Sequence, residues 1–243
     1  MAQIAPHRAV YTLSLDSISG SNSISGASGR MILDWADVCD GWATELDLRV
    51  RLFDPEGEEL RFGTALNTWE AKDGRVLRFR VKDRSTYFPS TNLVGRAVLD
   101  KTGAGEAHYS EPSDMTIQLP KGTLFPTAHS LAVLEAAEAG QQVMVAPLFD
   151  GSEEGQDALM EASAVILGPF EDKDTRIASL ASIPYYKVNL AFYRTDDKGA
   201  LPTHEATLRL YENGVVDRQL FDYGDFVLAA DISELTYHPD ADC

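Results

Sequence analysis

One acidic stretch, DGSEEGQDALME from Asp150 to Glu161, has residue types and spacing that could bind a metal ion. An EF-hand calcium loop places oxygen ligands at its first, third, fifth and twelfth positions and glycine at its sixth, and this stretch does the same. Its fifth residue is nevertheless Glu rather than Asp or Asn, its eighth is Asp157, and Pro147 stands where a helix should enter. The sequence therefore favours an acidic surface loop, with calcium binding as the alternative.

The histidines offer little for metal or acid–base chemistry. None of the five lies three or four residues from another, so no pair of metal ligands is visible; they are His7, His108, His129, His204 and His238. His129 comes early in a predicted helix and is the candidate general base, although a structural or exposed histidine is the favoured interpretation.

Other catalytic motifs are absent from the sequence. It contains no G-x-S-x-G nucleophile elbow, no phosphate-binding P-loop and no dinucleotide-binding glycine pattern. With 38 carboxylates, any pair proposed for glycoside hydrolysis would be arbitrary. We therefore expect no catalytic residue, no cofactor and no metal site.

Charge and hydropathy restrict the possible partners. The net charge of −17 argues against nucleic acid or an anionic membrane as the main partner, because both would repel the chain. No apolar run approaches the roughly 18 to 20 residues needed to span a bilayer. The N-terminal MAQIAPHRAVY lacks the features of a signal peptide, so the chain is either cytosolic or has lost its signal.

Two cysteines, Cys39 and the C-terminal Cys243, are too few for a usual four-ligand zinc site without nearby histidines. A cytosolic protein could carry both as unused thiols. A terminal position is nevertheless unusual for a buried cysteine, since chain ends often fray.

Alternation of apolar and polar residues dominates the chain and predicts antiparallel strands. The even positions from Trp42 to Leu52 are mostly apolar, whereas the odd positions between them are mostly charged. The turn sequence DPEG follows, then two further alternating segments around 60–68 and 77–81, which together predict a meander. About 12 to 14 such strands are expected in one domain, residues 1–243. So many strands must hide their edges by curling into a spiral or an incompletely closed barrel.

One segment, TAHSLAVLEAAEAG, predicts an amphipathic helix over residues 127–139. Leu131, Leu134 and Ala137 share one face, and Gly140 is suited to end the helix. A barrel of more than about eight strands is too wide for side chains alone to fill. We therefore expect this helix to pack inside the curled sheet through its leucine face.

Three segments carry a resemblance to a known family. HRAVYTLSLDSISGSNSISGASGRMILDWADVCDGW resembles the opening of the EipB-type cell-envelope integrity proteins of Gram-negative α-proteobacteria, and LFPTAHSLAVLEAAEAG followed by LFDGSEEG resembles their central signature. The likeness runs from His7 to Cys243. It implies a periplasmic protein with a cleaved signal peptide, a spiral sheet with a helix inside, and a disulfide between Cys39 and Cys243. It implies a role in envelope integrity without an established catalytic activity, and it gives no chemistry for the signature segments.

Three functions remain open from the sequence. The leading hypothesis is a non-enzymatic periplasmic protein that binds a partner protein or an apolar ligand through the concave interior or an open edge of the spiral. The alternative is a carrier or chaperone for lipids or lipoproteins, which needs an apolar cavity. The third is a hydrolase of envelope polymers, which needs carboxylates or a histidine cluster in a cleft. The client is expected to be neutral or basic, and the chain a monomer.

Overall fold

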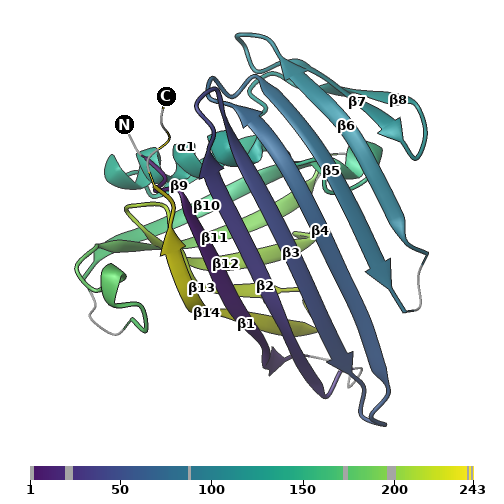
Figure 1. The fold of residues 1–243 in the computed structure, drawn as a ribbon, viewed down its shortest axis with the longest axis vertical. Helices are drawn as coiled ribbons and strands as arrows, with labels where there is room; N and C mark the ends of the chain where they lie inside the picture. Colours follow the sequence, from purple (N-terminus) through teal and green to yellow (C-terminus); the bar gives the residue numbers. More distant parts are fainter. Residues whose placement is uncertain are drawn as a thin grey trace.

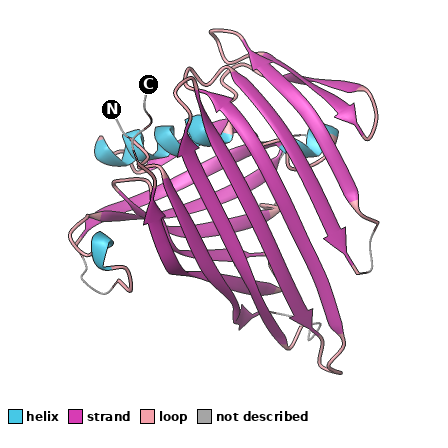
Figure 2. Ribbon diagram, in the orientation of Figure 1, coloured by secondary structure: helices cyan, strands magenta, loops and turns pink. Residues whose placement is uncertain are grey.

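The computed structural model describes residues 3–19, 24–86, 89–171, 175–195, 201–239, 241 and 243. They form one helix, α1 (Pro126–Glu138), the short 3₁₀ helices η1 (Gly155–Ala158) and η2 (Ala178–Leu180), and fourteen strands (Figure 1, Figure 2). The strands are β1 (His7–Ile18), β2 (Gly26–Asp37), β3 (Gly41–Phe53), β4 (Glu59–Ala71), β5 (Val76–Ser85), β6 (Thr91–Leu99), β7 (Gly105–Glu111), β8 (Met115–Leu119), β9 (Val143–Phe149), β10 (Leu159–Phe170), β11 (Tyr185–Arg194), β12 (His204–Tyr211), β13 (Val216–Asp222) and β14 (Phe226–Tyr237). The predicted all-β class and strand number are confirmed.

All fourteen strands belong to one antiparallel sheet. Pairing of β1 with β14 joins the two ends of the chain at its middle, and β8 and β9 are its two edges. Figure 1 shows β1 to β4 passing in front of β10 to β13 and β5 and β6 further to the right, with α1 behind the upper ends of the front strands. The sheet therefore curls into the predicted spiral, an incompletely closed barrel with two free edges.

Strand β3 shows how alternation directs side chains. Its even residues face the interior, where Val50 and Leu52 are buried, and its odd residues, such as Arg49, face outward. Strands β1 and β2 extend further into the Ser/Gly-rich stretch than the sequence suggests, to Ile18 and from Gly26. The reason is pairing, because β3 is long enough to provide hydrogen-bond partners for all of β2.

Helix α1 begins one residue before the predicted start, with Pro126 at its first turn, and Gly140 follows its end with a φ of 71°. Leu134 and Ala137 are buried as expected, but Leu131 is only partly buried. Val133 and Ala136 are buried as well. The helix is thus covered on more than the single expected face, because it lies inside the curled sheet.

Within the part of the chain that the structure describes, the interior contains three apolar clusters. One lies among β1 to β3 and β11 to β14, a second among β5 to β8 with the residues flanking α1, and the third surrounds α1. In the third, Trp35 of β2 and Trp42 of β3 pack against a cluster formed by residues of α1 and of β10 to β12, so this cluster joins both walls of the spiral. No helix in the described residues is long and apolar enough to cross a membrane.

Candidate functional site

The free edge of β9 is the part of the sheet best suited to bind another chain. The amide of Ile166 donates to the carbonyl of Gln142 at 2.8 Å, and in an antiparallel pair the inward-directed peptide groups alternate along the strand. The peptide groups of the odd residues Val143 and Val145 therefore point away from β10. Pro147 is in the same phase, where a residue without an amide hydrogen costs no ladder bond.

One end of this edge is already covered. The amide of Leu124 donates to the carbonyl of Pro147 at 2.8 Å, and the amide of Phe149 donates to the carbonyl of Leu124 at 3.0 Å. This short parallel bridge occupies the second half of β9. The first half, from Val143 to Val145, has no such cover among the described residues.

Apolar side chains surround the uncovered half. Val143 is 59% exposed, Val145 54%, Val165 43% and Leu167 51%, and all four face outward from β9 and the neighbouring β10. We call these four residues the β9 edge patch. Exposed valines beside unpaired peptide groups are a feature that folded proteins usually avoid, because such an edge pairs readily with another strand.

The opposite edge, β8, differs. Helix η1 packs on β8, and Gly155 of η1 lies close to the Met115 side chain. Met115 also packs against the second apolar cluster. The two edges are therefore unequal, and β9 offers more exposed apolar surface.

Glu70 is a buried carboxylate that the sequence analysis did not single out. From β4 it accepts hydrogen bonds from the amides of Thr127 at 2.7 Å and Ala128 at 2.8 Å, and so caps the start of α1. Burial nevertheless raises its pKa to about 7. The sequence signal was present, since a glutamate follows Leu66 and Thr68 on the inward-facing row of β4.

His129 is buried inside the spiral. Burial lowers its pKa to about 4, and its Nε2 has no hydrogen-bond partner in the described part of the chain. A general base must reach its substrate, and this side chain is covered by its neighbours. The structure brings no carboxylate into hydrogen-bond contact with it within the described residues, so the geometry favours the structural interpretation.

The Asp150–Glu161 loop does not adopt a calcium-binding arrangement. The Asp150 carboxylate accepts hydrogen bonds from the amide and the hydroxyl of Ser152, both at 2.9 Å, and burial raises its pKa. Glu161 lies in β10 and is exposed on the outer face, opposite Pro147. Among the described residues, no three histidine, cysteine or acidic side chains form a group that could hold a metal ion.

Cys39 and Cys243 form a disulfide with a Cα–Cα distance of 5.8 Å. Cys39 lies in the turn between β2 and β3 with a φ of 66°, a value that non-glycine residues rarely adopt. The Cys39 amide donates a hydrogen bond to the Asp37 Oδ1 at 2.9 Å, which stabilises the turn. The bond therefore fixes the C-terminal residue to this turn.

Comparison with known proteins identifies the same family that the three sequence segments resemble. A sequence model described as EipB-like matches residues 1–239. This chain belongs to the EipB-like family. The chain is 31% identical over 245 residues to the cell envelope integrity protein EipB of Brucella abortus (strain 2308), covering 96% of this chain and 84% of that protein.

Solved structures support the fold of this EipB-like chain. A crystal structure of a β-barrel-like protein of a domain of unknown function from Brucella abortus superposes with a TM-score of 0.87 and 28% identity. The match covers 98% of this chain and all of the other. The related EipB is named for envelope integrity and not for a catalytic activity.

The two signature segments of this EipB-like chain meet in space. Phe125, from LFPTAH, and Phe149, from LFDGSEEG, have ring centroids 6.3 Å apart, and Phe149 also contacts Phe79 and Tyr109 edge-on. The Tyr109 hydroxyl donates to the carbonyl of Glu153 at 2.9 Å. The segments thus build an aromatic cluster within the second apolar cluster of the interior, which gives them a structural role.

Proposed function

We propose that this EipB-like chain maintains the cell envelope as a non-catalytic binding protein, and that its β9 edge receives an extended segment of a partner protein. The observation that carries the proposal is the coincidence of outward-directed peptide groups and exposed valines at Val143 and Val145. An incoming strand would pair with the peptide groups and pack alternate apolar side chains on the β9 edge patch.

The size of the uncovered edge limits what it can hold. The backbone groups of Val143 and Val145 offer a few hydrogen bonds, each contributing about 0.5–1.5 kcal/mol. Apolar contacts to the four patch residues add to this, so a short client segment would bind with modest affinity. The overall charge of −17 favours a neutral or basic client.

The disulfide supports a location in an oxidising compartment of the envelope, the periplasm. Cytosolic thiols are kept reduced, and a bond between Cys39 and Cys243 would not persist there. We therefore place the partner in the periplasm as well.

Replacing Val145 with proline tests the edge. The substitution removes an amide hydrogen that points away from β10, so pairing within the sheet is kept, as at Pro147. Val145→Thr is the matched control, because threonine keeps both the amide and the branched shape.

The measurement is resistance to envelope stress in a strain that depends on this chain, with the melting temperature of each purified variant. We expect Val145→Pro to lose protection with its melting temperature nearly unchanged, and Val145→Thr to protect. Full protection by a folded Val145→Pro variant would rule out strand addition at this edge.

A second candidate, a carrier of an apolar ligand, is favoured by one observation. Several inward-facing residues of β2 to β4 are only partly buried although they line the interior, among them Leu33, Leu46, Leu48, Leu60 and Phe62. Half-covered apolar side chains inside a curled sheet leave room for an acyl chain.

Native mass spectrometry of protein purified from the envelope tests this candidate. A carrier would retain an added lipid mass, and Leu48→Asp would remove it by placing a charge on the inner wall. If neither the wild type nor this variant carried an added mass, the carrier hypothesis would be wrong and the β9 edge would remain the proposed binding site.

A further inference from the structure

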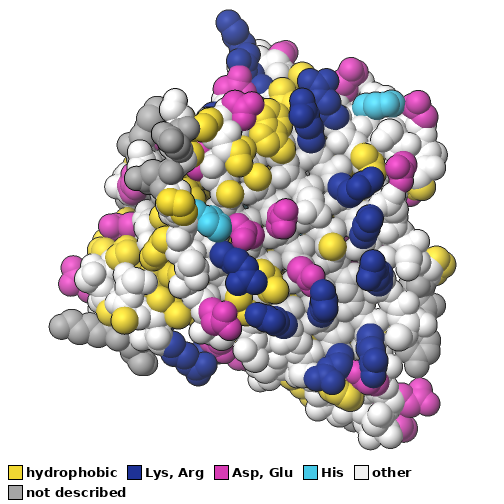
Figure 3. All heavy atoms as spheres, viewed as in Figure 1, with side chains coloured by type: hydrophobic (Ala, Val, Ile, Leu, Met, Phe, Trp, Pro, Cys, Tyr) yellow, Lys and Arg dark blue, Asp and Glu magenta, His cyan; other side chains and the backbone are white. Residues whose placement is uncertain are grey.

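The outer face of β2 to β6 is basic although the whole chain is strongly acidic. Nine of the 21 lysines and arginines occupy outward positions there: Arg30, Arg49, Arg51, Arg61, Arg78, Arg80, Lys82, Arg84 and Arg96. Four acidic residues share this face, Asp34, Glu45, Asp47 and Glu59. Figure 3 shows the lysine and arginine side chains gathered over these strands.

Several of these arginines stand directly opposite one another on neighbouring strands. The register pairs Arg30 with Arg49, Arg51 with Arg61, and Arg78 with Arg96. Like charges at such positions destabilise a sheet, because their Cβ atoms are only about 5 Å apart. The three pairs concentrate positive charge on this face.

Internal carboxylates neutralise only part of this charge. Asp47 binds Arg49 at 2.8 Å, and Glu59 binds Arg61 at 2.8 Å and lies 3.8 Å from Arg51. Arg30, Lys82 and Arg84 have no acidic partner within the described residues.

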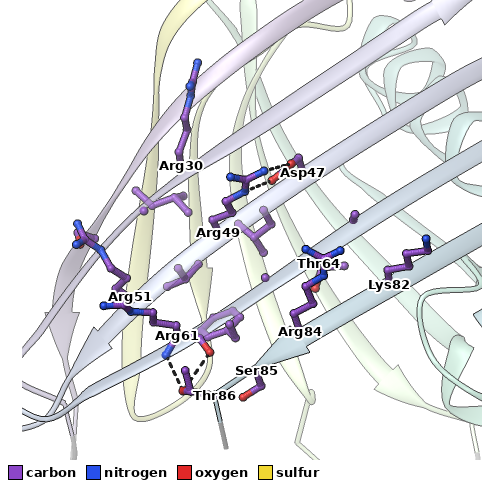
Figure 4. A pocket seen from close by; sticks show the side chains of 18 of the residues that line it. Arg30, Asp47, Arg49, Arg51, Arg61, Thr64, Lys82, Arg84, Ser85 and Thr86 are labelled. Atoms are coloured by element: carbon purple, nitrogen blue, oxygen red, sulfur yellow. Dashed lines mark hydrogen bonds and ion pairs between the residues drawn. The ribbon is translucent and has the colours of Figure 1, made fainter. Parts of the chain in front are cut away.

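A groove of about 1070 Å³ lies over β2 to β5 at the end of this face that is nearer the β3–β4 turn. Figure 4 shows Arg30, Arg49 and Arg84 around it, carried by β2, β3 and β5. Gly63 of β4 lies in register between Arg49 and Arg84. A Cβ there would be 2.9 Å from the carbonyl oxygen of Leu48. Because glycine has no side chain, the space between the two arginines stays open down to the backbone of β4.

The same groove contains hydroxyl groups. Thr12 and Ser28 line it from β1 and β2, and the buried Ser28 Oγ has no hydrogen-bond partner in the described part of the chain. The Ser28 Oγ is closed to solvent, so the lining combines guanidinium groups with the hydroxyl of the exposed Thr12, which suits an oxyanion ligand.

We propose that this groove binds a compact ligand carrying more than one phosphate group. Guanidinium groups bind phosphate oxygens in a bidentate manner, and a dianionic phosphate can neutralise two arginines on strands about 4.8 Å apart, whereas a carboxylate carries one charge. The groove is too large for a single phosphate. The net charge does not prevent binding, because fields beyond about 8 Å are screened at physiological salt.

The site is separate from the β9 edge patch, so either proposal can fail without the other. Its chemistry is shared by a free molecule that carries several phosphates and by neighbouring phosphate headgroups on a lipid surface, which together present more than one phosphate. Two probes distinguish these sources: sodium tripolyphosphate in solution, followed by calorimetry, and sedimentation with phosphatidylcholine vesicles that contain phosphatidic acid.

Two double variants remove equal charge from the same face. Arg30→Gln with Arg84→Gln removes two groove arginines that have no acidic partner, and Arg80→Gln with Arg96→Gln removes two outside the groove. We expect the first to weaken binding of the effective probe by about tenfold or more, or ~1.4 kcal/mol, and the second by less than about threefold. The first should melt no lower than the wild type, since it relieves the repulsion between Arg30 and Arg49.

Binding of tripolyphosphate with this pattern assigns the groove to a free ligand, and binding of phosphatidic acid vesicles alone assigns it to neighbouring headgroups of a lipid surface. Equal weakening by the two double variants would show unspecific attraction to a basic face and overturn the proposal. If the wild type bound neither tripolyphosphate nor the phosphatidic acid vesicles at low salt, the proposal would be overturned as well.

Discussion

At the residue scale, the most consequential side chain is Glu70, which links the sheet to the helix. A carboxylate at a helix start is stabilised by amide hydrogens and the helix dipole, yet here burial outweighs both effects and raises the pKa to about 7. The pKa of a glutamate in the unfolded chain is about 4.5. Folding therefore favours the protonated form in the range between these values.

The first prediction follows from the sign of this shift. Between about pH 4.5 and pH 7 the unfolded glutamate is ionised and the folded one protonated, so raising the pH favours unfolding. The contribution of Glu70 is fully present below pH 4.5 and is lost as the pH rises through 7, by up to about 3 kcal/mol. Glu70→Gln should lack this loss, as measured by guanidinium denaturation at several pH values. Parallel pH profiles of the two proteins would contradict the assignment.

His129 gives the opposite pH dependence. Its pKa is lowered to about 4 by burial, whereas an unfolded histidine titrates near 6.5. As the pH falls from 6.5 to 4, His129 becomes protonated in the unfolded chain but stays neutral in the folded chain. This difference destabilises the fold by up to about 3 kcal/mol. His129→Leu should remove this acid-side loss while resistance to envelope stress remains. Loss of resistance by a folded variant would instead indicate a chemical role for the histidine.

At the scale of elements, α1 occupies the interior of the curled sheet and packs against its inner face. Leu134 is fully buried among residues of β10 to β12, whereas the next residue, Glu135, is exposed. The helix has no side-chain cap of its own, because its first residues follow Phe125 and the cap comes from Glu70.

Truncating this helix tests its place. Leu134→Ala should lower the free energy of unfolding by about 2–5 kcal/mol, because it leaves a cavity between the helix and the sheet. Glu135→Ala, one position away on the exposed side, should change it by less than about 0.5 kcal/mol. Similar values for the two variants, from denaturant titration, would mean that α1 does not occupy the interior.

At the scale of the whole molecule, the sheet brings both ends of the chain together. Strands β1 and β14 pair along their lengths, and the disulfide then fixes Cys243 to the β2–β3 turn. Lys72 reinforces this turn, since its Nζ lies 2.7 Å from Asp37 and over the ring of Trp42. The turn therefore connects β2, β3 and β4 to the C-terminus.

Removing the disulfide should destabilise the whole fold. It closes a loop with a sequence separation of 204 residues, for which the chain-entropy treatment gives about 5 kcal/mol. Cys39→Ser with Cys243→Ser should therefore lower the melting temperature, and the denatured, unreduced wild type should show no free thiol. Two free thiols in the denatured protein, purified without a reductant, would exclude the bond.

The sequence alone determined the local features of this fold. Alternation along Trp42–Leu52 specified a strand with one inner face, since a shift of one residue would expose the whole apolar row. The Ala- and Leu-rich segment ending at Gly140 specified the helix within one residue. The resemblance to a family supplied the pairing of Cys39 with Cys243, which no local pattern contains.

Only the tertiary structure decided which residues meet. Pairing order left β9 as an edge, and the bridge at Leu124 then covered one half of that edge and left Val143 and Val145 free. The same pairing placed arginines of β2, β3 and β5 in one groove. It also brought Glu70 into hydrogen-bond contact with the start of α1, at Thr127, 57 residues further along the chain. These arrangements depend on contacts between distant segments, and a periodic pattern gives the face of a residue but not its neighbour across the sheet.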